Sequence, residues 1–106
     1  MTIYIGNAFS LNMLDRTGKP RSPRPWSLDM VQTFLSRVPT APVSCIGHED
    51  TARIVSSLLG RSVPVNRITV RLADEDTLLV AQYVGPRLPE GTTVLPEGAR
   101  VEWWAI

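Results

Sequence analysis

The only histidine of the chain, His48, lies in the stretch SCIGHEDTARIVSSLLG, where a short apolar run meets a helical pattern. A strand that ends at Gly47 and turns into a helix places free backbone N–H groups and the positive end of the helix dipole at one point, where an anion can bind. An imidazole titrates near neutral pH, so His48 could give or take a proton there. The alternative is a histidine that caps the helix or packs at the corner, because one polar residue rarely identifies a site.

Two acidic residues, Glu49 and Asp50, directly follow this histidine in the first turn of the expected helix. Carboxylates in a first turn complement the helix dipole, but they would repel a phosphate bound at the same place. An anion site at this corner therefore requires both carboxylates to point away from the pocket.

The stretch NAFSLNML, residues 7–14, supplies amide and hydroxyl groups just beyond the first expected strand. Side chains such as Asn7, Ser10 and Asn12 suit contacts with bases, riboses or phosphates when they lie at the carboxyl end of a strand. The alternative interpretation is an Asn/Ser turn that caps a short helix.

A third stretch, GPRLPEG at residues 85–91, presents Arg87 and Glu90 on a loop that two prolines stiffen. A guanidinium can bind phosphate oxygens with two parallel hydrogen bonds, and a fixed carboxylate can orient or accept a proton. Taken alone, such a pair is more often two solvated charges or a weak ion pair.

The hydrophobic pattern predicts the elements that must position these groups. Strands are expected at residues 3–6, 42–46, 67–72, 77–85 and 101–106, and helices at residues 28–38 and 48–60. The strands at 67–72 and 77–85 should form a hairpin, and the basic, proline-rich residues 15–25 should form a mobile surface loop. The order of elements predicts an α/β fold, a single-domain mixed β-sheet of about five strands flanked by helices.

Composition narrows the class of protein. The 106 residues are 43% hydrophobic and 20% charged, which is ordinary for one globular domain spanning residues 1–106. A net charge of +1 argues against a protein that binds duplex nucleic acid through a basic face. The single cysteine, Cys45, excludes an internal disulfide, and no zinc ligand set is apparent. With neither a secretory signal nor a membrane-spanning run, we expect a cytoplasmic protein that does not associate with membranes.

In their residues and in their order along the chain, these motifs resemble those of the ring nucleases of type III CRISPR immunity. This family is typified by archaeal viral anti-CRISPR proteins that destroy cyclic tetra-adenylate. The resemblance rests on NAFSLNML, IGHEDTARIVSSLLG, an Asn-Arg pair at 66–67 and RLPEG, and it extends over residues 3–91. It implies a homodimer that binds cyclic tetra-adenylate in a pocket across its two-fold axis and cuts it into linear di-adenylates without a metal or cofactor. Whether such a protein serves a virus or a cell is not implied.

The resemblance also implies roles for individual residues. His48 would protonate the 5'-oxygen leaving group, Arg87 would stabilise the pentacoordinate phosphorane, and Glu90 would support the histidine or the transition state. The residues expected to position the substrate are Asn7, Ser10, Asn12, Arg67 and Gln82.

The chain departs from the viral pattern at two places. Residues 15–25 are longer than the connection expected there, and a second Leu-Pro-Glu-Gly turn at residues 95–98 replaces an expected helix. Two other functions stay open: a module that sequesters a cyclic nucleotide without cleaving it, and a DNA-binding viral protein that uses the basic loop. The near-neutral charge counts against the DNA-binding function.

Overall fold

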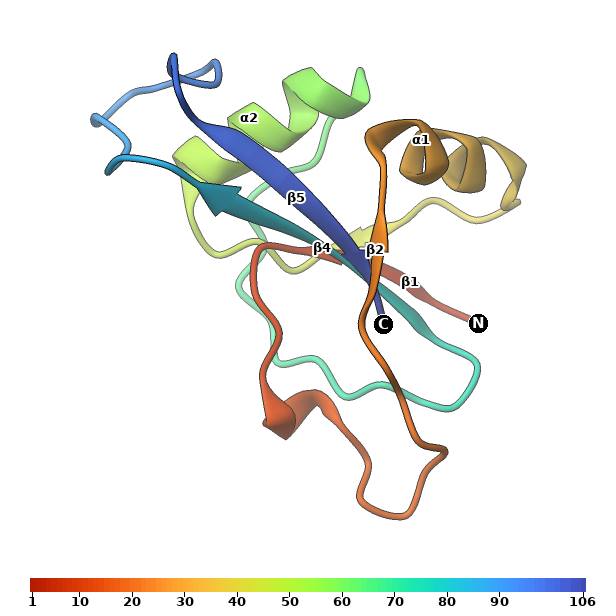
Figure 1. Cartoon of the computed structure of the whole chain (residues 1–106). Coiled ribbons are helices and arrows are strands. Elements are labelled where there is room, and N and C mark those ends of the chain that lie inside the picture. The colour runs from red at the N-terminus through yellow and green to blue at the C-terminus, as the bar shows by residue number, and fades with distance from the viewer.

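The structure is a computed structural model that describes all of residues 1–106. Its elements, drawn in Figure 1, are β1 (Ile3–Gly6), a 3-10 turn (Leu11–Met13), β2 (Arg24–Trp26), α1 (Leu28–Arg37), β3 (Val43–Ser44), α2 (Glu49–Leu59), β4 (Thr77–Val84) and β5 (Arg100–Ala105). The five strands form one sheet in the order β2-β5-β4-β1-β3. Strand β1 is parallel to both β3 and β4, whereas β5 is antiparallel to β4 and β2. The predicted α/β fold with a mixed five-stranded sheet is confirmed.

Both helices have the boundaries that their end residues favour. The hydroxyl of Ser27 accepts a hydrogen bond from the backbone N–H of Met30 at 3.1 Å and caps the start of α1. Helix α2 ends at Gly60, whose left-handed conformation (φ 67°) is one that glycine adopts without strain. Neither helix has the length and apolar character needed to cross a lipid bilayer.

The two faces of the sheet are covered differently. Both helices pack on one face, where they and the strands enclose a core of 13 buried residues that includes Ile5, Val55 and Leu79. The other face has no helix, and irregular segments cover it over a cluster of only four buried residues: Val70, Leu72, Leu78 and Val80. In Figure 1 the helices lie above the sheet and the irregular segments hang below it. We call these the helix face and the loop face.

The expected strand at residues 67–72 is wrong, and so is the hairpin it was to form with residues 77–85. Its second half alternates, with Val70 and Leu72 buried between exposed neighbours, but Ile68 is 43% exposed and the segment joins no strand of the sheet. The backbone N–H of Leu72 bonds to the carbonyl of Met13 at 2.8 Å, in the other covering segment. The segment cannot pair with β4, because β1 and β5 already occupy both edges of that strand. The alternating apolar residues here indicate burial against the loop face and not a strand.

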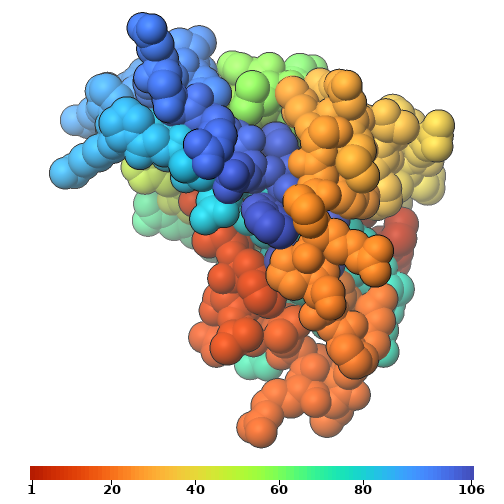
Figure 2. All heavy atoms as spheres, viewed as in Figure 1, coloured from red at the N-terminus to blue at the C-terminus, as the bar shows by residue number.

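The prediction of a mobile loop over residues 15–25 is also wrong in part. Its last residues enter β2, which pairs with Trp103–Ala105 at the edge of the sheet. The guanidinium of Arg21 donates hydrogen bonds to the backbone carbonyls of Ala73, Asp76 and Ile106. Figure 2 shows the red and orange N-terminal segment as a lobe extending from the body of the molecule. The segment is thus fastened at its C-terminal end to the sheet that it covers.

Candidate functional site

Three neighbouring parallel strands end at the same edge of the sheet. In the order β4-β1-β3, each is followed by a segment with a candidate side chain: Arg87 after β4, Asn7 after β1 and His48 after β3. In open α/β sheets the carboxyl ends of parallel strands form the usual place for ligands. The topology therefore brings together residues that lie far apart in the sequence.

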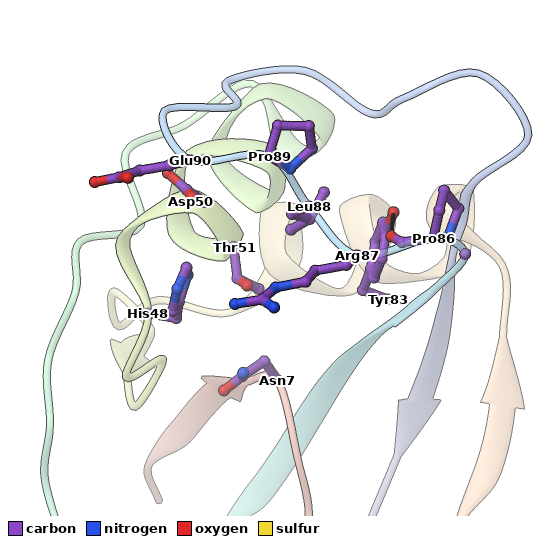
Figure 3. A pocket seen from close by; sticks show the side chains of 11 residues that line it. Asn7, His48, Asp50, Thr51, Tyr83, Pro86, Arg87, Leu88, Pro89 and Glu90 are labelled. Atoms are coloured by element: carbon purple, nitrogen blue, oxygen red, sulfur yellow. Dashed lines mark hydrogen bonds between the residues drawn. The ribbon is translucent and has the colours of Figure 1, made fainter.

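A cavity of about 970 Å³ opens at this edge, and we call it the central cavity (Figure 3). Its lining residues are Asn7, His48, Asp50, Thr51, Tyr83, Gly85, Pro86, Arg87, Leu88, Pro89 and Glu90. The three residues expected to be catalytic and one expected to position the substrate thus share one cavity. Figure 3 shows the guanidinium of Arg87 extending toward His48, with Asn7 beside them at the end of β1.

The side chain of His48 neither caps α2 nor packs into the core. It is the N-cap of α2, but its side chain makes no capping hydrogen bond and is exposed. Residues 66 and 67 fix the backbone of the β3–α2 corner instead. Arg67 donates from Nε to the carbonyl of Gly47 at 2.8 Å, and the side-chain amide of Asn66 donates to the carbonyl of Ser44 at 2.8 Å. The imidazole is therefore available to a ligand, and the alternative of a structural histidine loses its support.

Arg87 and Glu90 lie on the β4–β5 loop, residues 85–99, which is closed at its base. A Cβ at Gly85 would lie 2.7 Å from the Cβ of Ala99, so only glycine allows the two ends of the loop to approach this closely. The hydroxyl of Tyr83 donates to the carbonyl of Pro86 at 2.5 Å, and that of Ser57 in α2 donates to the carbonyl of Thr93 at 3.4 Å. These contacts fix the base of the loop and connect it to α2, the helix that follows His48.

The charges around the central cavity are arranged on two sides. Arg87 takes part in none of the ion pairs of the molecule, so its guanidinium is free to bind an anion. Figure 3 shows Asp50 and Glu90 near each other on the other side of the cavity, with the Asp50 carboxylate directed away from His48 and Arg87. An anion is accommodated on the His48–Arg87 side, and a hydrogen-bond donor on the acidic side.

The two first-turn carboxylates behave differently. Glu49 points away as expected and pairs with Arg53 at 2.6 Å along a separate cavity beside α2. The expectation for Asp50 is met only in part: the residue is 7% exposed and lines the central cavity, but its carboxylate is directed away from His48 and Arg87, the side where a phosphate would bind. Successive residues of a helix are turned by about 100°, so neighbouring first-turn residues cannot both face the same way. Its one ion pair, with Arg53, is long at 3.8 Å, so the N-terminus of α2 supplies much of the positive potential around this carboxylate.

The remaining expected substrate contacts lie outside the central cavity. Ser10 caps the 3-10 turn by accepting from the backbone N–H of Asn12 at 3.3 Å, and both residues are exposed on the covering segment. Arg67 lines the cavity beside α2 and supports the corner rather than facing His48. Gln82 lies in a neighbouring cavity on the loop face, which also includes Asn7.

Three polar residues of the cavity were not expected from the sequence to face a ligand: Asp50, Thr51 and Tyr83. Thr51 lies in IGHEDTARIVSSLLG, one of the stretches on which the family resemblance rests, so the sequence contained a signal for it. For Tyr83 we find no such signal, because its place depends on where β4 ends. No group of three or more His, Cys, Asp or Glu side chains is placed to hold a metal ion.

Known proteins resemble this chain in sequence and in fold. The family model described as STIV B116-like matches residues 3–98. A protein named "Uncharacterized protein 26", from Sulfolobus islandicus filamentous virus (isolate Iceland/Hveragerdi), is 36% identical over 52 residues, which are 49% of this chain and 43% of that protein. The match thus spans less than half of the length of this viral relative.

The fold is also that of a solved viral protein. B116 of Sulfolobus turreted icosahedral virus superposes with a TM-score of 0.82 over 99% of this chain and 97% of its own, at 23% identity. At this identity the likeness concerns the fold alone. Because the family model covers residues 3–98, including every residue of the central cavity, the chain belongs to the STIV B116-like family.

Proposed function

We propose that this protein is a ring nuclease that cleaves cyclic tetra-adenylate into linear di-adenylates without a metal ion, which would switch off type III CRISPR signalling. The observation that carries the proposal is that one cavity contains two available groups. His48 is exposed and its side chain makes no capping hydrogen bond, and Arg87 forms no ion pair. The motif resemblance supplies the substrate class. An acid and a free guanidinium are the two groups that metal-free cleavage of RNA needs most.

In the proposed reaction the ribose 2'-hydroxyl attacks the neighbouring phosphorus, a new 2'-oxygen–phosphorus bond forms, and the bond from phosphorus to the 5'-oxygen breaks. The 2'-hydroxyl proton passes to water, and protonated His48 gives its proton to the departing 5'-oxygen. Arg87 stabilises the negative charge of the phosphorane. The product ends in a 2',3'-cyclic phosphate, and two such cuts convert the ring into two di-adenylates.

The acidic side of the cavity has a different part in the proposal. Glu90 makes no ion pair and lies beside Asp50 rather than bonded to His48, so in this proposal it supports the transition state as a hydrogen-bond acceptor that holds the ribose in place. A ribose hydroxyl is a suitable donor to this carboxylate. The substrate phosphate then occupies the opposite side, between His48, Arg87 and Asn7.

The proposal includes a homodimer. A four-fold cyclic substrate is matched by two equivalent cavities around a two-fold axis, because each subunit would contact half of the ring. Symmetry doubles the few fixed positive groups of each subunit, so a chain of net charge +1 suffices for a ligand with four phosphates. Light scattering at micromolar concentration should give twice the mass of 11.7 kDa.

The deciding experiment incubates the pure protein with cyclic tetra-adenylate in EDTA and follows the products by chromatography. The expected product is di-adenylate, and His48→Ala should lower the rate constant by about 10²- to 10⁴-fold while binding persists. Glu49→Gln is the matched control, because this neighbour points away from the central cavity and should leave the rate nearly unchanged. Absence of product over hours at micromolar protein would reject the proposal.

The same experiment separates the other candidate functions. Recovery of the intact ring from a tight complex would identify a sequestering module. A steep salt-dependent affinity for duplex DNA, with no effect of cyclic oligoadenylates on thermal stability, would identify a DNA-binding protein.

A further inference from the structure

A second cavity lies on the loop face, next to the central cavity. It has a volume of about 480 Å³, within the usual range for ligand pockets. We call it the aromatic cavity, and its lining residues are Asn7, Ala8, Phe9, Pro23, Val80, Gln82, Trp104 and Ile106. Asn7 lines both cavities, so one ligand can occupy both by passing this side chain.

We propose that the aromatic cavity binds a nucleobase of the ligand whose phosphate lies in the central cavity. The chemistry of its lining carries this inference. Phe9 and Trp104 are half-buried at the edge of the four-residue cluster, so both rings are fixed by packing and still reach the cavity. Fixed aromatic rings beside a phosphate site are the usual platform on which single-stranded bases stack.

Two amides give this apolar cavity its polar rim. Gln82 follows Leu78 and Val80 at alternate positions of β4, so the strand directs it to the loop face as well. Neither Gln82 nor Asn7 has a structural task comparable to that of Asn66, whose amide holds the carbonyl of Ser44. An amide can accept from the amino group of adenine and donate to its N7, which is the pairing that distinguishes adenine from other bases.

The place of the cavity in the sheet supports the same occupant. Trp104 lies opposite Val80 across the β4–β5 pair, and Gln82 is the next loop-face position toward the end of β4 that leads to Arg87. Aromatic wall, amide and guanidinium thus follow one another along a single strand direction. A nucleotide has the same order of groups: base, sugar and phosphate. That this base is adenine rests on the proposed function, whereas the existence of a base-binding cavity does not.

The test uses linear di-adenylate as the probe and side-chain NMR as the readout. We expect the amide signals of Asn7 and Gln82 and the indole signal of Trp104 to shift when di-adenylate is added. Di-inosinate, which carries a carbonyl in place of the adenine amino group, should bind about 3- to 10-fold more weakly. Shifts confined to residues of the central cavity would overturn the proposal.

Two variants and a control measure the contribution of the cavity. Phe9→Ala should weaken di-adenylate binding by about 5- to 100-fold through lost stacking, and Gln82→Ala should remove the preference over di-inosinate. Gln82 is exposed, so its variant stays informative if Phe9→Ala unfolds. Met30→Ala, an exposed apolar truncation in α1, is the matched control and should change neither. Unchanged affinity in both test variants would refute the nucleobase cavity.

The outcomes distinguish this inference from the proposed function. If Phe9→Ala and Gln82→Ala both cleave cyclic tetra-adenylate as fast as the unaltered protein, the nucleobase cavity is refuted and the ring-nuclease proposal stands. Di-adenylate binding that depends on Phe9 and Gln82, without any cleavage by the unaltered protein, would keep the base cavity and remove the ring nuclease. A Trp104 indole NMR signal that shifts with protein concentration alone, and not with di-adenylate, would assign this face to a second copy of the chain and overturn the inference.

Discussion

The two faces of the sheet differ in what covers them, and the difference determines how much of the sheet each face buries. On the helix face, two regular helices and the strands bury 13 residues in one cluster. On the loop face, residues from irregular segments bury a cluster of four, and the aromatic cavity stays open beside it. A helix satisfies its own backbone hydrogen bonds and presents a continuous apolar stripe to the sheet. The backbone groups of a loop need other partners or water, so loops cover a sheet incompletely. The thinly covered face therefore leaves side chains of the sheet itself, Val80, Gln82 and Trp104, accessible from the aromatic cavity.

Adjacent leucines of β4 test this comparison most directly. Leu78 and Leu79 are both 0% exposed, but they point to the loop face and the helix face respectively. Leu79→Ala should lower the free energy of unfolding by about 4 kcal/mol, because the helices around the new void cannot collapse. Leu78→Ala should cost about 2 kcal/mol, since loops can move into the space. Urea denaturation measures both, and equal losses would contradict the idea that the two faces differ in rigidity.

A single side chain should account for much of what holds the loop face in place. Arg21→Ala removes hydrogen bonds to the carbonyls of Ala73, Asp76 and Ile106, and should cost about 2 kcal/mol of unfolding free energy. Arg16→Ala, at an exposed position of the same segment, serves as the control and should cost less than about 0.5 kcal/mol. Similar values for the two variants would mean that packing alone fastens the segment.

A smaller effect is expected at the border of the two faces, where α2 begins. The helix face holds α2 firmly, so the Asp50 carboxylate cannot move far from a bound phosphate. In a His48→Ala background, Asp50→Asn should raise the affinity for cyclic tetra-adenylate by about 3- to 10-fold. Glu49→Gln should change it by less than about twofold, because that carboxylate faces the other way. Calorimetry measures both, and weaker binding of Asp50→Asn would show that the ligand uses this carboxylate as a hydrogen-bond acceptor.

The smallest effect concerns the one thiol of the molecule. Cys45 packs against the loop-face cluster, and burial raises the pKa of its thiol. At pH 8 it should react with a disulfide reagent more slowly than free cysteine, by about an order of magnitude. Because the unfolded chain would ionise at the lower, ordinary pKa, the free energy of unfolding should fall as the pH rises past that value. A reaction as fast as that of free cysteine would show that the loop face opens readily.

Local patterns in the sequence predicted most of the helix face and less of the loop face. The strand at 3–6 and both helices follow from alternation, capping residues and three-to-four spacing, which are local properties. Strand β2 has only three residues, one of them Pro25, and exists because a distant strand offers it an edge. Residues 67–72 alternate like a strand but lack a partner, and alternation alone cannot reveal that.

The candidate site was predicted to a similar extent. His48, Arg87, Glu90 and Asn7 meet in the central cavity because they follow strand ends, which the sequence indicates. The direction of the Asp50 side chain depends on how the first turn of α2 is rotated relative to residues 85–90. These residues lie 35 or more positions further along the chain, so no local pattern reveals the contact. Ser10 and Arg67 carry the right chemistry, but their polar atoms bond to the backbone nearby.

The close approach of Gly85 and Ala99 has a consequence for how the family can diverge. Both positions lie at the base of the β4–β5 loop and outside the charged groups of the site, yet a side chain at 85 would collide with Ala99. Any change there would swing Arg87 and Glu90 together, as one unit. Positions 85 and 99 should therefore covary among relatives. Such covariation would indicate selection on the orientation of the loop that presents Arg87 and Glu90.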